Sequence, residues 1–377
     1  MKLMKIKKLF IILCIFVSIP FNLSMLHESS EDTYETKHSK MYEVVMNAPL
    51  FFNETTHWFN VSILKETPLY DFDGILIAYC FDLQNTDTEE NAYIIINADD
   101  NAFPIVQYSP KSVSPYFHIT ETALYMGVGV YYYDDGTNIT NILTGKTTVK
   151  LYDNNENEHI DNIDNKLSVA CDINYSIAWD YYADSSNITR NTPVTVILSG
   201  VPNWQWTRGC SPTAVGMQLA KNIPTLTNSL TSSQIINRLA DNMGTTSSGS
   251  TPWVNHGSGT AQFLVSNGFS RPRFSDWYNK SSNGTPLFGA ANNPYSTFVS
   301  EINSGRAVSV GSTGSTVKTP GYPNGWNSHV VTGLGYSYVT GFPWQYIIVH
   351  TTSANDGQVY LFLNNNIVNY AWFIVRP

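Results

Sequence analysis

The segment from residue 167 to residue 377 carries helical patterns first and β-type runs afterwards, and this order restricts its fold more than any other feature. Helices are predicted over 211–221, 232–243 and 296–304. Runs of β-branched and aromatic residues, bounded by turn residues, follow at 330–336, 346–350, 359–363 and 370–375. Helices followed by a block of strands are typical of an α+β domain.

The part of the chain before this domain has the pattern of strands from Met41 onward. Runs of β-branched and aromatic residues cover 75–81 and 92–97. The Asp135-Gly136 pair is typical of a hairpin turn. We therefore expect a small, mostly antiparallel β domain over 26–152, which begins with a mobile polar spacer at 27–40.

Residues 153–166 form a composition break between these two parts. The stretch has few apolar residues and carries five acidic ones, namely Asp153, Glu156, Glu158, Asp161 and Asp164. Such a composition buries too little apolar surface to become ordered, so we predict an exposed linker. Exposed linkers are also the places where proteases cut chains.

The first residues have the pattern of a targeting signal. Lysines at positions 2, 5, 7 and 8 precede an apolar run at 9–19. A basic start followed by a short apolar run is typical of a secretory signal peptide, which we place at 1–25. The run is short for a bilayer span, so we expect a secreted, extracellular protein with no stable membrane anchor. An uncleaved anchor stays open as an alternative, because no clean small-residue cleavage site follows.

Composition excludes several classes of protein. Hydrophobic residues make up 42% of the chain, which is enough for a sizeable core and argues against global disorder. The net charge of -9, without a basic stripe, argues against nucleic acid as a partner. No residues have metal-ligand spacing and no glycine-rich phosphate loop occurs, so we expect neither a metal nor a cofactor.

The cysteine count points to a reactive thiol. The chain has four cysteines, Cys14, Cys80, Cys171 and Cys210. Removal of the leader leaves an odd number, and an unpaired thiol in a secreted protein is a candidate for reactivity. Cys80 and Cys171 either form a disulfide or remain buried free thiols, and the second interpretation is favoured.

Cys210 is the strongest candidate, because it stands at the start of a predicted helix. Gly209 before it allows a sharp entry into the helix and leaves the sulfur uncovered. Pro212 fits the first turn, where a missing N–H costs nothing. The positive end of a helix favours the thiolate, which is the nucleophilic form of cysteine.

A histidine distant in sequence is expected to act as the base for this thiolate. His329 is the first choice, since it opens a predicted strand after a turn-rich segment and would be exposed yet held in orientation. His256, in a loop between glycine and serine residues, is a distant second. His350 lies inside a β run and is expected to be structural or supporting.

The motifs at 209–214 and 328–336 together resemble the papain-like cysteine peptidases related to the bacteriocin-processing, double-glycine peptidases. The resemblance runs from about Val201 to the end of the chain, and the pair of motifs in this order is fairly specific. Residues 93–100 are similar to the pro-region of streptopain-like peptidases, which is a weaker match. The resemblance implies a papain-like fold, with a central helix against an antiparallel sheet, preceded by the small β pro-domain.

The resemblance also implies roles for individual residues. Cys210 would be the nucleophile, His329 the base, and Gln205 a donor to the oxyanion, although Gln205 lies one residue closer to the cysteine than is usual in this family. Relatives carry Asp or Asn as the third catalytic residue, where this sequence has Thr351. Asn355 follows soon after and is a second candidate for that role.

These expectations combine into one leading hypothesis. The chain would be a secreted cysteine endopeptidase made as a zymogen, with a protein or peptide substrate and its own pro-domain as an intramolecular inhibitor. A catalytically weak papain-fold binding module is the first alternative, motivated by Thr351. A transglutaminase-like acyl transferase that uses the same Cys210–His329 pair is the second.

Overall fold

The fold is described from a computed structural model, which covers residues 30–52, 58, 60–149, 175–186, 193–277, 279–280, 286–287, 295–313, 329–342, 344–353, 357–363 and 369–376. The chain divides into a short unit, residues 1–39, and a large unit, residues 40–377. The signal peptide predicted at 1–25 and the linker predicted at 153–166 lie outside the described residues, as do the domain boundaries at 152 and 167.

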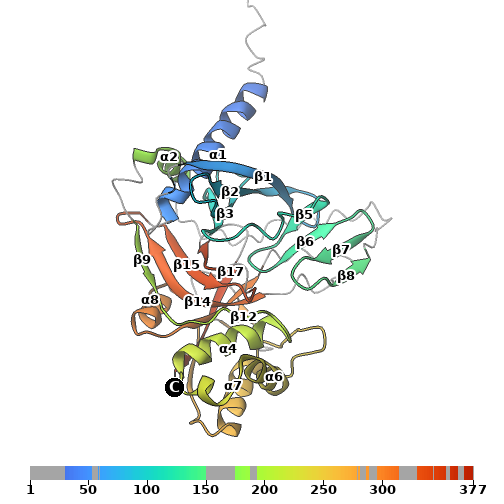
Figure 1. The fold of residues 1–377 in the computed structure, drawn as a ribbon, viewed down its shortest axis with the longest axis vertical. Helices are drawn as coiled ribbons and strands as arrows, with labels where there is room; N and C mark the ends of the chain where they lie inside the picture. Colours follow the sequence, from blue (N-terminus) through green and yellow to red (C-terminus); the bar gives the residue numbers. More distant parts are fainter. Residues whose placement is uncertain are drawn as a thin grey trace, which may run out of the picture. The chain divides into compact units, whose positions relative to one another are not determined.

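One large sheet dominates the second unit (Figure 1). Its strand order is β10 (Arg273–Trp277), β17 (Asn369–Arg376), β13 (Val308–Thr313), β14 (His329–Tyr338), β15 (Gln345–His350), β16 (Val359–Phe362), β4 (Ile105–Ser109), β3 (Asn91–Asn97), β2 (Leu76–Asn85), β1 (Val61–Tyr70), β5 (Thr122–Tyr125), β6 (Tyr131–Asp134), β7 (Asn138–Asn141) and β8 (Thr147–Val149). β9 (Val194–Ile197) pairs with β14, which brings the sheet to 15 strands. β1 and β5 are parallel, whereas neighbours such as β1 and β2 or β4 and β16 are antiparallel, so the sheet is mixed. The short strands β11 (Asn279–Lys280) and β12 (Pro286–Leu287) pair separately.

The expected fold class is wrong. A papain-like domain, with a central helix against its own sheet, was expected to follow a separate small β domain. Instead β16 pairs with β4, where Tyr360 lies opposite Tyr108 and Leu361 opposite Gln107, so one sheet continues through both expected domains. The physical reason is that β4 and β16 would otherwise each present a row of unpaired backbone groups, and pairing satisfies both edges.

A shared aromatic core reinforces this strand pairing. Phe103 stacks on Phe362 with ring centroids 3.5 Å apart. The hydroxyls of Tyr182 and Tyr346 lie 2.8 Å apart in a hydrogen bond. Tyr182 belongs to α2 (Tyr175–Ala183), and the same core contains buried residues of α1 (Ser30–Phe52). Residues from both expected domains therefore stabilise one another.

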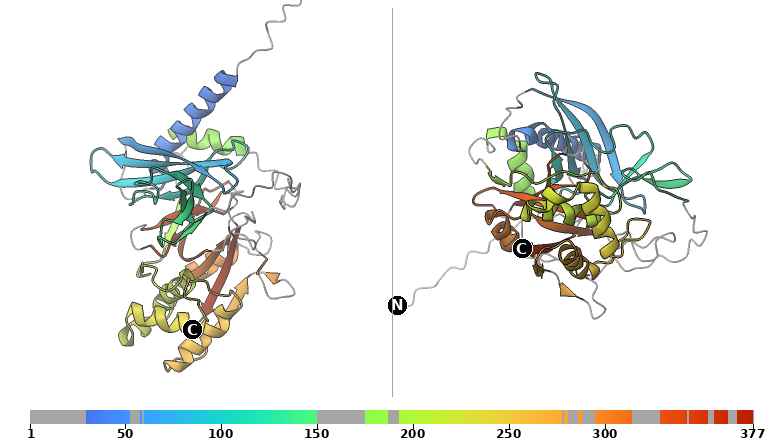
Figure 2. Two further views of the ribbon diagram at one scale, coloured as in Figure 1. Left: turned by 90° about the vertical axis from the view of Figure 1, so that its right-hand side faces the viewer. Right: turned by 60° about the horizontal axis from the view of Figure 1, so that its bottom comes forward.

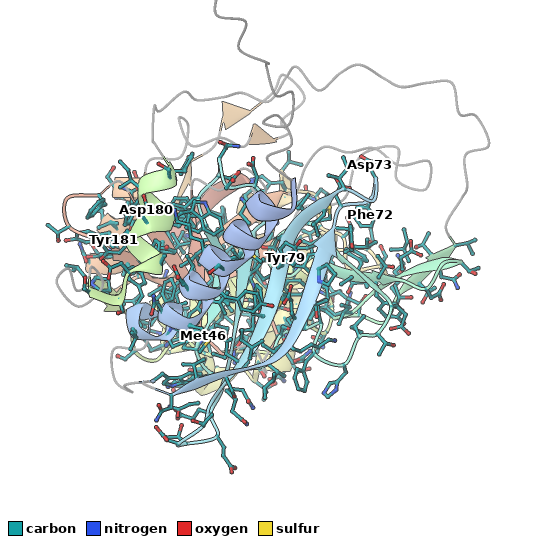
Figure 3. All side chains as sticks on the ribbon, turned by 90° about the horizontal axis from the view of Figure 1, so that it is seen from above. Met46, Phe72, Asp73, Tyr79, Asp180 and Tyr181 are labelled. Atoms are coloured by element: carbon teal, nitrogen blue, oxygen red, sulfur yellow. The ribbon has the colours of Figure 1, made fainter. Side chains whose placement is uncertain are left out.

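Helix α1 contradicts the expectation of a spacer and a strand in this region. The residues that it buries recur at helical spacing: Met41, Val44, Val45, Ala48 and Phe51. Figure 3 shows the part of α1 around Met46 beside the first strands of the sheet, near Tyr79, which packs against the same core. The apolar residues of this segment therefore follow the period of a helix, and the strand pattern predicted here was wrong.

The helices of the second half agree with the sequence in three places. α4 (Cys210–Asn222), α6 (Ser232–Asn242) and α8 (Tyr295–Asn303) match the predicted helices, while α2, α5 (Leu226–Ser229) and α7 (Asn255–Ser266) were not predicted. The four β runs predicted after residue 329 correspond to β14, β15, β16 and β17. No helix in the described part of the chain is long and apolar enough to span a membrane.

Polar contacts with the sheet fix the position of α4. The Thr332 hydroxyl of β14 donates to the Ala214 carbonyl at 2.9 Å. The buried Gln218 amide donates to the carbonyl oxygens of Ala307 and Phe373, and its own oxygen accepts from the Ser309 hydroxyl. Figures 1 and 2 show α4 grouped with α6 and α7 on the side of the sheet where β17 ends. These contacts hold the first residue of α4, Cys210, at a defined place above β14.

Candidate active site

Gly209 places Cys210 at the start of α4. Its φ of 146° lies in the region that side chains rarely adopt, and a Cβ here would lie 2.7 Å from the Gly249 carbonyl oxygen. The Thr213 hydroxyl donates to the Gly209 carbonyl at 2.8 Å and closes the first turn. This position therefore requires glycine, as the sequence predicted for a sharp entry.

Cys210 forms a hydrogen bond with the His329 side chain. Burial is the largest single effect and raises the pKa of the Cys210 thiol, but the charge and hydrogen bond of His329, together with two further hydrogen bonds, lower it overall. These two hydrogen bonds come from the backbone N–H of Val330 and the hydroxyl of Ser211. The helix start adds a favourable dipole, so the site favours a thiolate.

His329, the first residue of β14, is held from its other side. Its Nε2 atom lies 3.1 Å from the Thr351 carbonyl oxygen and 3.3 Å from the Thr352 hydroxyl. A carbonyl only accepts hydrogen bonds, so Nε2 carries the proton of the neutral ring. Nδ1 is then the nitrogen available to accept the proton of the Cys210 thiol.

Thr351 therefore orients His329 through its backbone carbonyl rather than through its side chain. The Thr351 hydroxyl instead accepts from the backbone N–H of Ser353 at 3.4 Å. Thr352 has a φ of 71°, which is an outlier for a β-branched residue. This strained bend aims both the Thr351 carbonyl and the Thr352 hydroxyl at His329, and strain of this kind concentrates at functional sites. Sequence reasoning missed Thr352, since no local motif signals a positive φ at a threonine.

Gln205 lies on the segment before α4 and is exposed. The next residue, Trp206, donates its backbone N–H to the Thr352 carbonyl at 2.7 Å. The bend that orients His329 therefore also anchors the segment that carries Gln205. Asn355, the other candidate for the third catalytic residue, lies outside the described residues.

A loop at 126–130 covers His329. It belongs to the N-terminal half, which is the part of the chain before residue 153. A Cβ at Gly129 would lie 2.1 Å from Cδ2 and 2.2 Å from Nε2 of His329, so the Gly129 backbone rests directly against the ring. The loop is a tight turn, in which the Met126 N–H donates to the Val130 carbonyl at 3.2 Å. The expectation that His329 would be exposed is therefore wrong, because this cover leaves it only 8% exposed.

Val128 anchors the covering loop in the core. It is fully buried in an apolar cluster that also contains Val331 of β14 and Val349 of β15. Val331 lies two residues after His329, so the anchor is adjacent to the Cys210–His329 pair. Sequence reasoning assigned inhibition to the N-terminal domain as a whole and did not identify this loop.

The other two candidate histidines have structural surroundings. His256 is buried between Trp253 and Phe373, and its ring nitrogens have no hydrogen-bond partner among the described residues. Burial lowers its pKa to about 3, so it is neutral and cannot act as a base in this environment. His350 donates from Nδ1 to the Gly357 carbonyl at 2.9 Å. Burial lowers the pKa of His350, although hydrogen bonds to the backbone of Gly357 and Val201 oppose this effect.

Cys80 provides a contrast within the same chain. It is a free, buried cysteine, and burial, with the nearby charge of Asp82, raises the pKa of its thiol well above the ordinary value. Cys171, its possible disulfide partner, lies outside the described residues. Of the two described cysteines, only Cys210 has surroundings that favour a thiolate.

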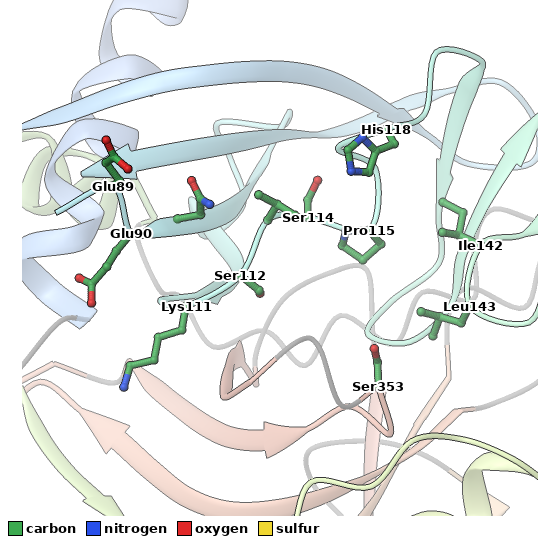
Figure 4. A pocket seen from close by; sticks show the side chains of 12 residues that line it. Glu89, Glu90, Lys111, Ser112, Ser114, Pro115, His118, Ile142, Leu143 and Ser353 are labelled. Carbon is green, nitrogen blue, oxygen red and sulfur yellow. The ribbon is translucent and has the colours of Figure 1, made fainter. Parts of the chain in front are cut away.

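A pocket of about 680 Å³ lies beside the bend that follows Thr351 (Figure 4). Its lining includes Ser353 of the bend and Lys111, Ser114 and His118 from the N-terminal half, but neither Cys210 nor His329. Lys65 fixes this segment by donating to the carbonyl oxygens of Tyr116, Phe117 and Ile119. The Cys210–His329 pair therefore does not open into this pocket.

Within the described residues, no group of His, Cys, Asp and Glu side chains is arranged to hold a metal ion. The Cys210–His329 pair can itself supply a thiol nucleophile, an imidazole that exchanges protons, and a helix start. Comparison with protein-family models and with curated protein sequences finds no match to this chain.

Proposed function

We propose that this protein is a cysteine peptidase that hydrolyses peptide bonds with Cys210 as nucleophile and His329 as base. One observation carries the proposal, namely the hydrogen bond between Cys210, at the helix start, and His329, whose Nε2 is bound by the Thr351 carbonyl. Nucleophile, base and orienting group are the three parts that covalent catalysis by a thiol needs. The motifs at 209–214 and 328–336 support the same activity.

The reaction follows from these contacts. The Cys210 thiolate attacks the carbonyl carbon of the scissile bond, and the His329 imidazolium then protonates the leaving amine. A water molecule, activated by the neutral His329, releases the acyl group from the sulfur. The backbone N–H of Cys210 and the exposed side chain of Gln205 are the candidate donors to the oxyanion, and one such donor contributes about 3–4 kcal/mol in comparable sites.

The N-terminal half acts as an intramolecular inhibitor in this proposal. Gly129 rests against the His329 ring, and Val128 holds the loop in the adjacent core. A peptide substrate needs access to the same histidine, so the loop at 126–130 and a substrate compete for one place. The protein would then be a zymogen whose activation requires movement of this loop. The basic and apolar pattern at 1–25 supports export of this zymogen from the cell.

Alkylation of the full chain tests the proposal. Iodoacetamide should label Cys210 and leave Cys80 unmodified, and His329→Gln should slow the labelling of Cys210 at neutral pH. Cys80→Ser is the matched control and should leave the rate unchanged. Equal labelling rates in the wild type and in His329→Gln would exclude the proposed pair.

Product analysis separates hydrolysis from acyl transfer. The test uses the Gly129→Ala chain, in which an added Cβ would displace the inhibitory loop from His329. This chain, but not the same chain with Cys210→Ala, should release new peptide amino groups from an unfolded protein substrate. Incorporation of an added primary amine without hydrolysis would replace the peptidase with an acyl transferase that uses the same thiol. Equal release of amino groups by the Gly129→Ala chain with and without Cys210→Ala would show that Cys210 is not the nucleophile.

A further inference from the structure

The other end of α4 carries a second feature that the peptidase chemistry does not use. A pocket of about 710 Å³ lies beside the last residues of α4, Lys221 and Asn222. Arg273 of β10, Arg376 of β17 and Arg306, which follows α8, also line it. One helix, two strands and one turn thus bring four cationic side chains to the same pocket.

Two of these cations are fixed by one buried carboxylate. The Glu301 side chain is 3% exposed and accepts hydrogen bonds from Arg306 Nε at 2.6 Å and from Arg376 Nε at 3.0 Å. The Arg306 and Arg376 side chains remain 30% and 38% exposed. Arg306 and Arg376, which both line the pocket, thus share one carboxylate.

The remaining two cations add positive charge to the same lining. The Arg273 side chain makes no hydrogen bond or ion pair with the described part of the chain, and Arg273 is exposed. The Lys221 ammonium donates to the Ser199 carbonyl, which is a neutral partner. The whole chain has a net charge of -9, so this concentration of positive charge is opposite to the average composition.

Hydrogen bonds between the Asn222 side chain and the backbone fix the shape of the pocket. The Asn222 amide donates to the carbonyl oxygens of Ala307 and Val375, and its oxygen accepts from the Ala307 N–H at 2.9 Å. These bonds link the end of α4 to the turn before β13 and to β17. The backbone that carries the arginines is therefore already ordered, so less conformational entropy is lost when a ligand binds.

We propose that this pocket binds a phosphate or sulfate group carried by a small molecule, such as a phosphorylated or sulfated sugar. Guanidinium groups match the paired oxygens of phosphate and sulfate, and their hydrogen bonds to these anions are charge-assisted. The volume exceeds that of one inorganic anion and lies in the range of about 300–1,000 Å³ that is usual for small-molecule sites. The negative end of the α4 dipole opposes anion binding, but about half a charge is small beside four cations that share a single carboxylate.

The site is separate from the catalytic pair. Cys210 and Lys221 stand at opposite ends of α4, which at about 1.5 Å per residue places their backbones roughly 16 Å apart. None of the residues that line the pocket contributes to the contacts of His329. The inference therefore does not depend on the proposed peptidase activity.

Calorimetric titration of the full chain tests the proposal. Inorganic phosphate, inorganic sulfate and glucose 6-phosphate should each show saturable binding in a buffer of constant ionic strength, whereas glucose and chloride should not. Arg273→Gln should weaken binding at least tenfold. Arg271→Gln is the matched control, because Arg271 is exposed two residues away and does not line the pocket.

The outcomes separate two sources of the anion. Tighter binding of glucose 6-phosphate than of inorganic phosphate would identify an ester as the ligand, and equal affinities would identify the free anion. No saturable binding of any of the three anions, or equal affinities for Arg273→Gln and the wild type, would overturn the proposal. If Arg273→Gln does not fold, Lys221→Gln provides a second variant with the same expected loss.

Discussion

The Nε2 atom of His329 lies 3.1 Å from the carbonyl oxygen of Thr351, so a backbone group orients the base of the candidate active site. A backbone carbonyl fixes the tautomer of a histidine as well as a side-chain oxygen does, since both accept the Nε2 proton. The cost of this arrangement is local, because Thr352 must adopt a φ of 71° to present that carbonyl. The threonine at 351 therefore does not by itself indicate a decayed site.

The side chains at 351 and 352 should differ in their effect on Cys210. Thr351→Val keeps the carbonyl and should change the rate of Cys210 alkylation by less than about threefold, whereas Thr352→Ala loses a hydrogen bond worth about 1 kcal/mol and should slow it about fivefold. Alkylation kinetics at neutral pH with mass-spectrometric readout measures both. A loss in Thr351→Val as large as in Thr352→Ala would show that the Thr351 side chain has the orienting role.

The pH dependence of alkylation should reveal the lowered pKa of Cys210. Only the thiolate reacts, so the rate rises with pH through the pKa of the thiol and reaches its plateau at lower pH than for an unperturbed cysteine. His329→Gln removes the charge that lowers the pKa and leaves the burial that raises it, so the midpoint should move above that of a free thiol. Rates measured from about pH 4 to about pH 10 in both proteins give the two midpoints. Coincident midpoints would contradict the electrostatic coupling.

The sequence was sufficient for the local part of the site. Gly209 and Cys210 could be placed at a helix start because glycine, cysteine and Pro212 each have a positional preference there. His329 could be placed at the start of a strand because turn residues precede it and β-branched residues follow. Each of these signals depends on neighbouring residues, so it is visible in one short stretch of sequence.

The long-range contacts could not be predicted in the same way. The pairing of β16 with β4 joins residues about 250 positions apart, and nothing in either strand specifies its partner. Gly129 gave no signal of its contact with His329, since a glycine in a turn has many ordinary explanations. The orienting role of Thr351 was hidden because it uses the backbone, which every residue has.

Gly129→Ala should open the candidate active site. The new Cβ would collide with the His329 ring, and alanine at a φ of +74° costs about 1–3 kcal/mol, which raises the population of the open loop by about 5- to 150-fold. His329 is held by Cys210, Thr351 and the start of β14, so the loop rather than the ring should move. The rate of Cys210 alkylation should rise accordingly.

The matched control for this variant is Gly136→Ala. Gly136 has a φ of +90° in the neighbouring turn, but no atom lies within 4 Å of the place that a Cβ would take there, so the substitution introduces backbone strain without a collision at His329. Its alkylation rate should equal that of the wild type. An increase of the same size in both variants would attribute the effect to general destabilisation and not to uncovering of the site.

His256 should make the protein less stable in acid. Its pKa is lowered from 6.5 to about 3 by burial, so below pH 6.5 the unfolded chain binds a proton at this ring and the folded chain does not. The free energy of unfolding should therefore fall as the pH decreases from 6.5 towards 3, by about 1.4 kcal/mol per pH unit from this residue. His256→Phe keeps an aromatic ring against Trp253 and Phe373 and should remove this part of the slope. Urea unfolding of both proteins at several pH values checks this, and parallel curves would refute it.

Cleavage between the two halves should not release the N-terminal half. A specific protease site inserted within 153–166 would allow the chain to be cut, and the fragments should still elute together from a sizing column without denaturant. They should stay together because β4 pairs with β16, and because Phe103 stacks on Phe362 in a core that both halves share. Separation would expose that core and leave two sheet edges unpaired. Elution of the N-terminal fragment alone in native buffer would show that the shared sheet does not survive the cut. Retention would instead mean that opening of the loop around Gly129, rather than loss of a domain, controls access to Cys210.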